Sequence, residues 1–168
     1  GKYAITTDSL NNAVATNDVI LLVVKPQDMQ ALLGEIKPHI NAKALVMSFV
    51  AGKKIGFIAE NLAPAQPIVR IMPNTPTSVG LGAAGYSFGS TVTEEHRRFV
   101  AKLLAAAGKA VEVDESLQDA ITATSGSGPA YFFAFVEAMV EGAVALGLSR
   151  EDATTLTIQT IVGSAALL

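Results

Sequence analysis

The chain has 168 residues, of which 50% are hydrophobic and 16% charged, and its net charge is −3 at pH 7. This composition excludes intrinsic disorder, and the charged fraction lies below the roughly 25% usual for soluble domains. No Lys/Arg run attracts nucleic acid, no apolar run is long enough to span a bilayer, and no cysteine is present, so a soluble, cytoplasmic protein is the default expectation.

The first part of the chain alternates short apolar runs with amphipathic stretches. Val19–Val24 is rich in β-branched residues and apolar at both odd and even positions, which predicts a parallel strand buried on both faces. The elements expected after it are a helix at 28–36, a strand at 44–48, a helix at 54–62, strands at 67–71 and 83–88, a helix that Thr93 caps and Gly108 stops, and a strand at 109–113. This alternation indicates an α/β fold with a parallel sheet.

After Asp114 the strand pattern ceases. Helices are expected at 115–123, from Pro129 to Gly147, and from a Ser149 cap to Leu168. The predicted domains are therefore an α/β domain at 1–113 and an all-α domain at 114–168. We expect the first to be incomplete at its N-terminus and the second at its C-terminus, where an apolar helix stops without a cap.

One motif is misleading. Gly80–Gly85 reads GLGAAG and matches the dinucleotide-binding pattern G-x-G-x-x-G. That loop needs a strand before it and a helix after it, so that pyrophosphate rests on the helix N-terminus. Here a turn-rich loop precedes the motif and the strand-like segment 86–90 follows it. The motif is therefore interpreted as a turn into a strand.

Three loops follow the three buried strands, at 24–27, 48–52 and 72–76. Ligands bind beyond the carboxyl ends of the strands in an open parallel sheet, so these loops are candidate binding loops; ordinary βα connections are the alternative. A fourth stretch, Thr124–Tyr131, is rich in Ser and Gly and runs into a helix that starts with Pro129. It fits an anion site at a helix N-terminus and a capped interhelical turn equally well.

The remaining polar candidates are weaker. His39 and His96 lack a second ligand at metal spacing and are interpreted as surface residues. Glu137 and Glu141 share a helix face without a nearby His or Cys, which indicates a polar stripe. No metal site is expected.

Four motifs taken together resemble those of pyrroline-5-carboxylate reductases, and the resemblance covers essentially the whole chain. They are Val-Lys-Pro-Gln at 24–27, Ala-Gly at 51–52, Arg-Ile-Met-Pro-Asn-Thr-Pro at 70–76 and Ser-Gly-Ser-Gly-Pro-Ala-Tyr at 125–131. The resemblance implies a Rossmann-like domain followed by a helical dimerisation domain, in a homodimer or larger homo-oligomer. It places the family's own glycine loop upstream of Gly1 and its Ser-Pro-Gly-Gly-Thr segment downstream of Leu168.

The resemblance also implies an activity and a set of site residues. Hydride would pass from NADPH, with NADH as the alternative, to the C=N carbon of 1-pyrroline-5-carboxylate and give L-proline. The implied cofactor-binding residues are Asp8, Val24, Lys25, Pro26, Ala51, Gly52, Met72 and Asn74. The implied substrate-binding residues are Ser125, Gly126, Ser127 and Gly128, and Thr122 is the candidate for proton relay.

Two alternatives remain open at this point. One is that the chain is a non-catalytic fragment of that enzyme, and the other is a related imine or hydroxyacid dehydrogenase on the same fold. Hydroxyacid dehydrogenases usually carry a catalytic Lys on the first helix of the helical domain, whereas residues 114–147 contain no Lys or Arg. No nucleic-acid or membrane partner is expected.

Overall fold

The computed structural model describes residues 8–168, which form two compact units. One unit extends through Gly126, and the other comprises Ser127–Leu168. The domain boundary near Asp114 stays a prediction.

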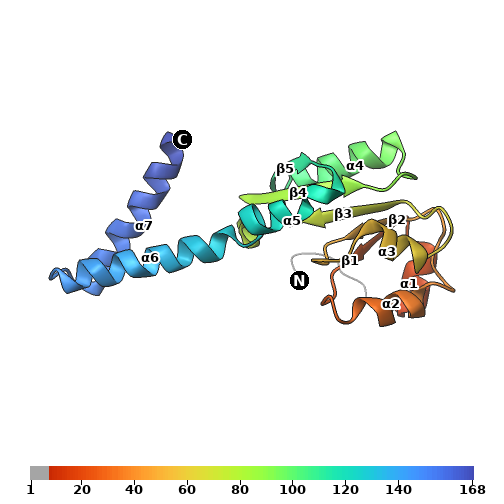
Figure 1. Ribbon diagram of the computed structural model, residues 1–168, viewed down its shortest axis with the longest axis horizontal. Helices are drawn as coiled ribbons and strands as arrows, with labels where there is room; N and C mark the ends of the chain where they lie inside the picture. Colours follow the sequence, from red (N-terminus) through yellow and green to blue (C-terminus); the bar gives the residue numbers. More distant parts are fainter. Residues whose placement is uncertain (1–7) are drawn as a thin grey trace. The chain divides into compact units, whose positions relative to one another are not determined.

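The first unit is built on a five-stranded sheet whose order follows the chain (Figure 1). Its strands are β1 (Val19–Leu22), β2 (Leu45–Ser48), β3 (Ile68–Met72), β4 (Gly82–Phe88) and β5 (Gly108–Glu112). The pairs β1–β2, β2–β3 and β4–β5 are parallel, whereas β3–β4 is antiparallel. The α/β prediction is confirmed, with one antiparallel pair inside a mostly parallel sheet.

The antiparallel pair has a simple cause. A parallel connection needs a crossover of a dozen or more residues, usually containing a helix. Residues 73–81 between β3 and β4 contain only a single 3₁₀ turn, η1 (Thr75–Val79). The chain therefore turns back on itself, with Gly80 at φ 74° ending the turn, and GLGAAG leads into β4 as the sequence predicted.

The helices of this unit cover both faces of the sheet. They are α1 (Leu10–Thr16), α2 (Met29–Ile36), α3 (Ile55–Glu60), α4 (Glu94–Ala105) and the short α5 (Gln118–Ile121), which lies between the 3₁₀ turn η2 (Glu115–Leu117) and the π-helical turn η3 (Thr122–Gly126). Thr93 caps α4 as predicted, because its Oγ1 accepts from the His96 N–H at 3.3 Å while His96 Nδ1 accepts from the Thr93 N–H. The helix ends at Ala105, before Gly108.

The apolar core is divided between the two faces. One cluster joins α1, α2 and α3 to β1–β3, and its centre includes Met29, Leu33 and Ile58. The other joins α4 to β2–β4 and includes Met47 and Val100. Figure 1 shows α1–α3 and α4 on opposite sides of the sheet.

The first strand differs from its prediction. The apolar run Val19–Val24 was expected to be buried throughout, but β1 ends at Leu22. Leu21 is 50% exposed and Val23 is 71% exposed, while Ile20 and Leu22 are buried. Ile20 and Leu22 face the cluster that includes α1 and α2, whereas on the opposite face Val19 is partly buried against the second cluster and Leu21 is left half exposed.

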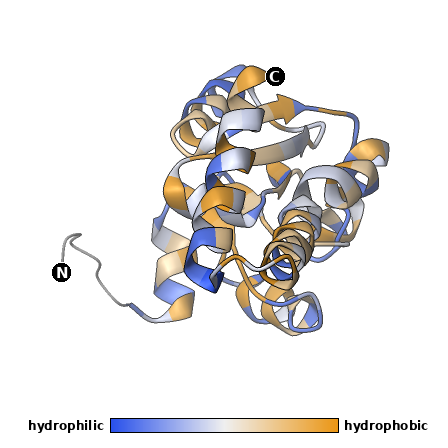
Figure 2. Ribbon diagram, turned by 90° about the vertical axis from the view of Figure 1, so that its left-hand side faces the viewer, coloured by the Kyte–Doolittle hydropathy of each residue, from blue (hydrophilic) through white to orange (hydrophobic). Residues whose placement is uncertain are grey.

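The second unit is a pair of packed helices, α6 (Gly128–Ala145) and α7 (Arg150–Leu167). Pro129 lies at the start of α6, and the Ser149 side chain accepts from the Asp152 N–H at 3.1 Å to cap α7, both as predicted. Many large apolar side chains of this unit are exposed, and Figure 2 shows hydrophobic residues recurring along its helices. Those on α6 are Tyr131, Phe132, Phe133, Phe135 and Met139. None of the helices in residues 8–168 combines the length and apolarity needed to cross a membrane.

Candidate active site

The predicted binding loops lie at one edge of the sheet. Leu22 pairs with Ser48, and Ser48 pairs with Arg70, so the carboxyl ends of β1, β2 and β3 are level. The loops that leave these ends are therefore neighbours in space, as the sequence analysis expected. Their expected cofactor residues Lys25, Pro26, Ala51 and Gly52 are exposed, and Val24, Met72 and Asn74 are half-buried.

The loop after β2 leaves open space above the sheet edge. Gly52 has φ +72°, a left-handed conformation that favours glycine. A Cβ at this position would meet no atom within 4 Å. The small side chain of Ala51 and the glycine that follows it therefore leave room for a flat group to approach the backbone.

Asn74 joins the loop after β3 to two other segments. Its Oδ1 accepts a hydrogen bond from the Ala83 N–H at 2.8 Å, at the start of β4. Its Nδ2 donates to the Ser125 carbonyl oxygen at 3.1 Å, in the π-helical turn. One amide side chain thus fixes the turn Thr122–Gly126 against the edge of the sheet where the binding loops lie.

The π-helical turn carries the candidate substrate residues of this unit. The Thr122 hydroxyl donates to the Gln118 carbonyl oxygen at 2.9 Å, and the Ser125 hydroxyl donates to the Ile121 carbonyl oxygen at 3.2 Å. In these orientations both hydroxyl protons are engaged, and both oxygens retain lone pairs to accept another hydrogen bond. A Cβ on Gly126 would lie 2.8 Å from Met72 Cε, the end of a flexible side chain, so the turn lies close to the Met72 side chain of β3.

Three predicted site residues lie outside the three loops and the turn. Asp8 is exposed and accepts from the Ser9 N–H at 2.7 Å and from Asn12 Nδ2, so its hydrogen bonds lie at the start of α1. Ser127 and Gly128 begin the second unit. The edge described here therefore consists of the three loops and the turn that ends at Gly126.

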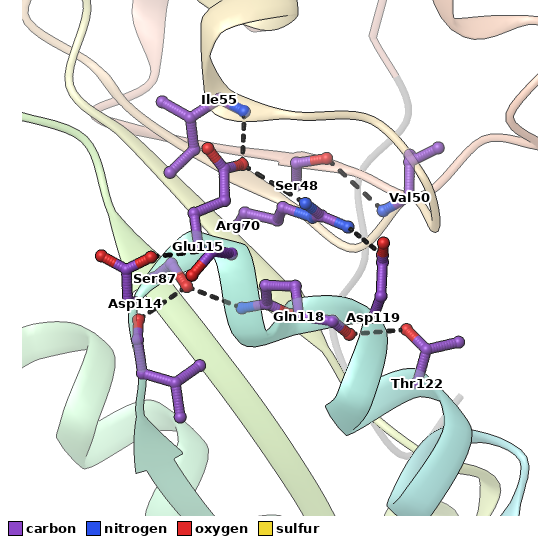
Figure 3. A network of polar contacts seen from close by, with 12 residues as sticks. Ser48, Val50, Ile55, Arg70, Ser87, Asp114, Glu115, Gln118, Asp119 and Thr122 are labelled. Atoms are coloured by element: carbon purple, nitrogen blue, oxygen red, sulfur yellow. Dashed lines mark hydrogen bonds and ion pairs between the residues drawn. The ribbon is translucent and has the colours of Figure 1, made fainter.

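A buried polar network that sequence reasoning missed lies beside the turn (Figure 3). Arg70, in the middle of β3, is 4% exposed. Its Nη1 lies 3.4 Å from Glu115 Oε1, and its Nη2 lies 3.8 Å from Asp119 Oδ1. Glu115 Oε1 also accepts from the Ile55 N–H at 2.7 Å, at the start of α3. The signal was present in the sequence, since an Arg inside an apolar strand is almost never buried without a partner.

The two ion pairs of Arg70 differ in strength. The Glu115 side chain is 28% exposed, whereas that of Asp119 is 93% exposed. A solvent-exposed pair contributes about 0–1 kcal/mol, but removing one partner of a buried pair costs about 3–5 kcal/mol. The contact with Glu115 is therefore the dominant one.

The segment next to this network carries further polar contacts. Hydrogen bonding by the Ser116 side chain, and then by its backbone N–H, lowers the pKa of Asp114 below its ordinary value. Gln118 is fully buried and donates from Nε2 to Ser87 Oγ at 2.9 Å. Ser87 in turn donates to the Val113 carbonyl oxygen at 2.8 Å. These contacts hold residues 113–118 against β4.

The weaker candidates have structural roles. His96 completes the cap of α4, and His39 is exposed. Glu141 forms a two-point ion pair with Arg150, at 2.7 and 3.0 Å, and this pairing lowers the pKa of Glu141. Across residues 8–168, no group of three His, Cys, Asp or Glu side chains is placed to hold a metal ion.

Fold and candidate site together define a class: a Rossmann-like α/β sheet with candidate binding loops at its carboxyl edge, followed by a helical unit. Comparison with known proteins identifies the member of this class. Residues 115–168 match the family described as pyrroline-5-carboxylate reductase dimerisation.

Whole-chain comparisons agree with this match. The chain is 39% identical to the pyrroline-5-carboxylate reductase of Methanosarcina acetivorans, over 95% of this chain and 60% of that protein. It is 41% identical to the enzyme of the same name from Pseudomonas aeruginosa, over 99% of this chain and 62% of that protein. The crystal structure of the Plasmodium falciparum pyrroline carboxylate reductase with NADP bound superposes with a TM-score of 0.90 at 34% identity, over 96% of this chain and 61% of that chain.

The chain is similar to pyrroline-5-carboxylate reductases over nearly its whole length, and its C-terminal third matches their dimerisation domain. It spans about 60% of the length of the curated relatives that it matches. The resemblance carried by the four sequence motifs is thereby confirmed.

Proposed function

We propose that the whole protein reduces 1-pyrroline-5-carboxylate to L-proline with NADPH, and that NADH is the alternative reductant. The observation that carries the proposal is the Asn74 bridge, because it holds the substrate turn beside the three cofactor loops. The family relationship supplies the reaction, and the bridge supports it with an arrangement of residues that suits two adjacent ligands.

The sheet edge fits a dinucleotide. The Plasmodium falciparum relative carries NADP in its structure. In this chain there is open space over Gly52, and residues 25–26 are exposed, so both loops are accessible to a ligand. We assign Val24, Lys25 and Pro26 to the ribose and pyrophosphate, Ala51 and Gly52 to the nicotinamide ribose, and Met72 and Asn74 to the nicotinamide ring. Asp8 is assigned to the adenosine end.

For this reaction the protein mainly has to orient the substrate and the cofactor relative to each other. The bound cofactor supplies hydride to the electrophilic C=N carbon, and one proton on nitrogen completes L-proline. The chain's own residues hold the two rings in contact and exclude water between them, which accounts for a site rich in Gly, Ser, Thr and Asn. Thr122 is the proposed proton relay, and it must first rotate its hydroxyl away from the Gln118 carbonyl oxygen, to which it donates in this structure.

The substrate carboxylate is assigned to the turn and to the start of the next helix. Ser125 and Gly126 lie on the turn, and Ser127 and Gly128 follow at the N-terminus of α6. The helix dipole favours an anion at the start of a helix of this length, although Pro129 has no N–H and the Ala130 N–H donates to the Ser127 carbonyl oxygen.

We also propose that the protein is a homodimer or a larger homo-oligomer. The matched family is named for dimerisation, and the exposed aromatic side chains of α6 form an apolar surface of the kind that a partner chain covers. A monomer in light scattering of the whole protein would contradict this part of the proposal. The proposed compartment is the cytoplasm, where a biosynthetic reductase meets its reduced cofactor.

The direct test is NADPH oxidation by the purified whole protein with 1-pyrroline-5-carboxylate, with proline measured as product. A panel of hydroxy acids with NADP⁺ serves as the comparison. Faster turnover of a hydroxy acid than of the cyclic imine would assign the protein to a different dehydrogenase on the same fold.

A further inference from the structure

Three buried polar residues cross the sheet in a single row. Ser48 on β2 pairs with Arg70 on β3, and Arg70 pairs with Ser87 on β4. All three are at most 4% exposed. They lie on the face that carries α1–α3, because Val46 and Ile68, two residues before Ser48 and Arg70, belong to that cluster. The apolar core on this face therefore ends at a polar row.

The segment that covers this row has polar anchors beside one apolar contact, that of the Ile121 side chain with Gly85 on β4. Leu117 is 52% exposed, and the one buried side chain between residues 115 and 121 is Gln118. Gln118 bonds Ser87, and Glu115 pairs with Arg70. The position of α5 over the sheet, and of the turn that continues from it, thus depends on these two polar anchors together with the Ile121 contact.

Arg70 reaches further than this segment. Through Glu115 Oε1 it connects to the Ile55 N–H, at the first residue of α3, which follows the loop of Ala51 and Gly52. Arg70 also lies two residues before Met72, the last residue of β3, and four before Asn74 in the loop that follows. Figure 3 shows the guanidinium between Glu115 and Asp119, with Ile55 on the far side of the Glu115 carboxylate. One side chain is therefore linked to two of the three proposed cofactor loops and to the segment that precedes the substrate turn.

We propose that Arg70 is a positioning residue, which holds the turn Thr122–Gly126 in register with the loops after β2 and β3. One part of this inference rests on the proposed function: that the register of the turn with the two loops sets the affinity for the cyclic imine. Arg suits the position because its planar, permanently charged fork addresses two carboxylates at once. Lys would keep the charge but present a single point donor.

The test uses the whole protein and two readouts. In Arg70→Lys, amide hydrogen exchange at 120–126 and 55–57 should become about tenfold faster or more, while exchange at 45–48 in β2 stays unchanged. KM for 1-pyrroline-5-carboxylate should rise by about tenfold, with a smaller change in kcat. Arg97→Lys is the matched control, because Arg97 pairs with Glu112 at 2.6 Å outside this network and should leave both readouts unchanged.

A second variant keeps the proposal testable if Arg70→Lys does not fold. Glu115→Gln retains an acceptor for the Ile55 N–H but removes the charge opposite Arg70, and it should reproduce the local exchange and the KM increase in part. Equal acceleration of exchange at 120–126 and 45–48 would overturn the proposal, since Arg70 would then contribute only to global stability; unchanged exchange at 120–126 in both variants would overturn it as well. If the wild-type protein does not reduce the imine, the proposed function fails, and the exchange readout still decides the positioning role.

Discussion

Replacing Asn74 with Asp tests the bridge to the substrate turn with an isosteric change. Asp keeps the acceptor for the Ala83 N–H but places a second acceptor against the Ser125 carbonyl oxygen. The lost hydrogen bond costs about 0.5–1.5 kcal/mol, and the unpaired, half-buried charge adds about 1–3 kcal/mol. Together they predict a loss of about 1.5–4.5 kcal/mol at pH 7. At about 2–4 °C per kcal/mol, Tm should fall by about 3–18 °C.

The same change predicts a pH dependence with a definite sign. The Ser125 carbonyl oxygen disfavours the charged form of the introduced carboxyl group, which can donate to that oxygen again once it is protonated. The folded-state pKa of the introduced carboxyl is therefore raised above the unfolded value of about 3.9. Relative to wild type, the variant should regain stability as the pH falls through this raised pKa. Denaturant titrations of both proteins between pH 7 and pH 4 measure the difference.

Asn61→Asp is the matched control for this experiment. Asn61 Nδ2 donates to the Phe57 carbonyl oxygen at 2.8 Å, and its Oδ1 accepts from Gln30 Nε2 at 3.0 Å, outside the site. Both variants should lose stability, but only the Asn74 variant should raise KM for the imine, by about tenfold. Equal effects of the two variants on KM, or an unchanged Tm in Asn74→Asp, would refute the reasoning from the bridge.

Three further predictions concern stability and are checked by chemical denaturation. Thr93→Ala removes the acceptor for the His96 N–H and should cost about 1 kcal/mol, whereas Thr93→Ser should cost little. Ala65→Gly should stabilise the protein by about 0.5–1 kcal/mol, since Ala65 is exposed at φ 62°; a loss of stability would contradict the strain argument. Burial, followed by the charge of Glu112, raises the pKa of Tyr86 above 10.0. The neutral phenol therefore adds to the free energy of unfolding in full below pH 10, and this stabilisation is lost as the pH rises through the raised pKa. Tyr86→Phe should remove this part of the alkaline decline.

Most helices and strands of the first unit could be predicted because their signals are local. The apolar runs of β2 and β3 and the Thr93 cap lie within a few residues of the structures that they specify. The exposure of Leu21 in β1 could not be predicted in this way, because it depends on what covers that face of the strand and not on the apolarity of the side chain. The direction of β4 was accessible, since residues 73–81 are too few for a parallel crossover.

The candidate site likewise has parts that the sequence predicts and parts that it does not. The position of the three candidate binding loops follows from the topology, as parallel strands end at one edge. The Asn74–Ser125 hydrogen bond spans a sequence separation of 51 residues, and the Arg70–Glu115 ion pair spans one of 45. No local sequence pattern predicts contacts between positions so far apart. Only the presence of Arg70 inside a buried strand signalled that a partner existed. The π-helical turn was likewise hidden, since it is stabilised by hydroxyl bonds from Thr122 and Ser125 to backbone carbonyls.

The measurement that tests the central claim most directly is the reaction of the whole protein with 1-pyrroline-5-carboxylate and NADPH. The account predicts one L-proline formed for each NADPH oxidised, with Asn74→Asp slower than wild type at low substrate concentration and Asn61→Asp equal to it. Absence of proline, with a hydroxy acid oxidised in its place, would contradict the account.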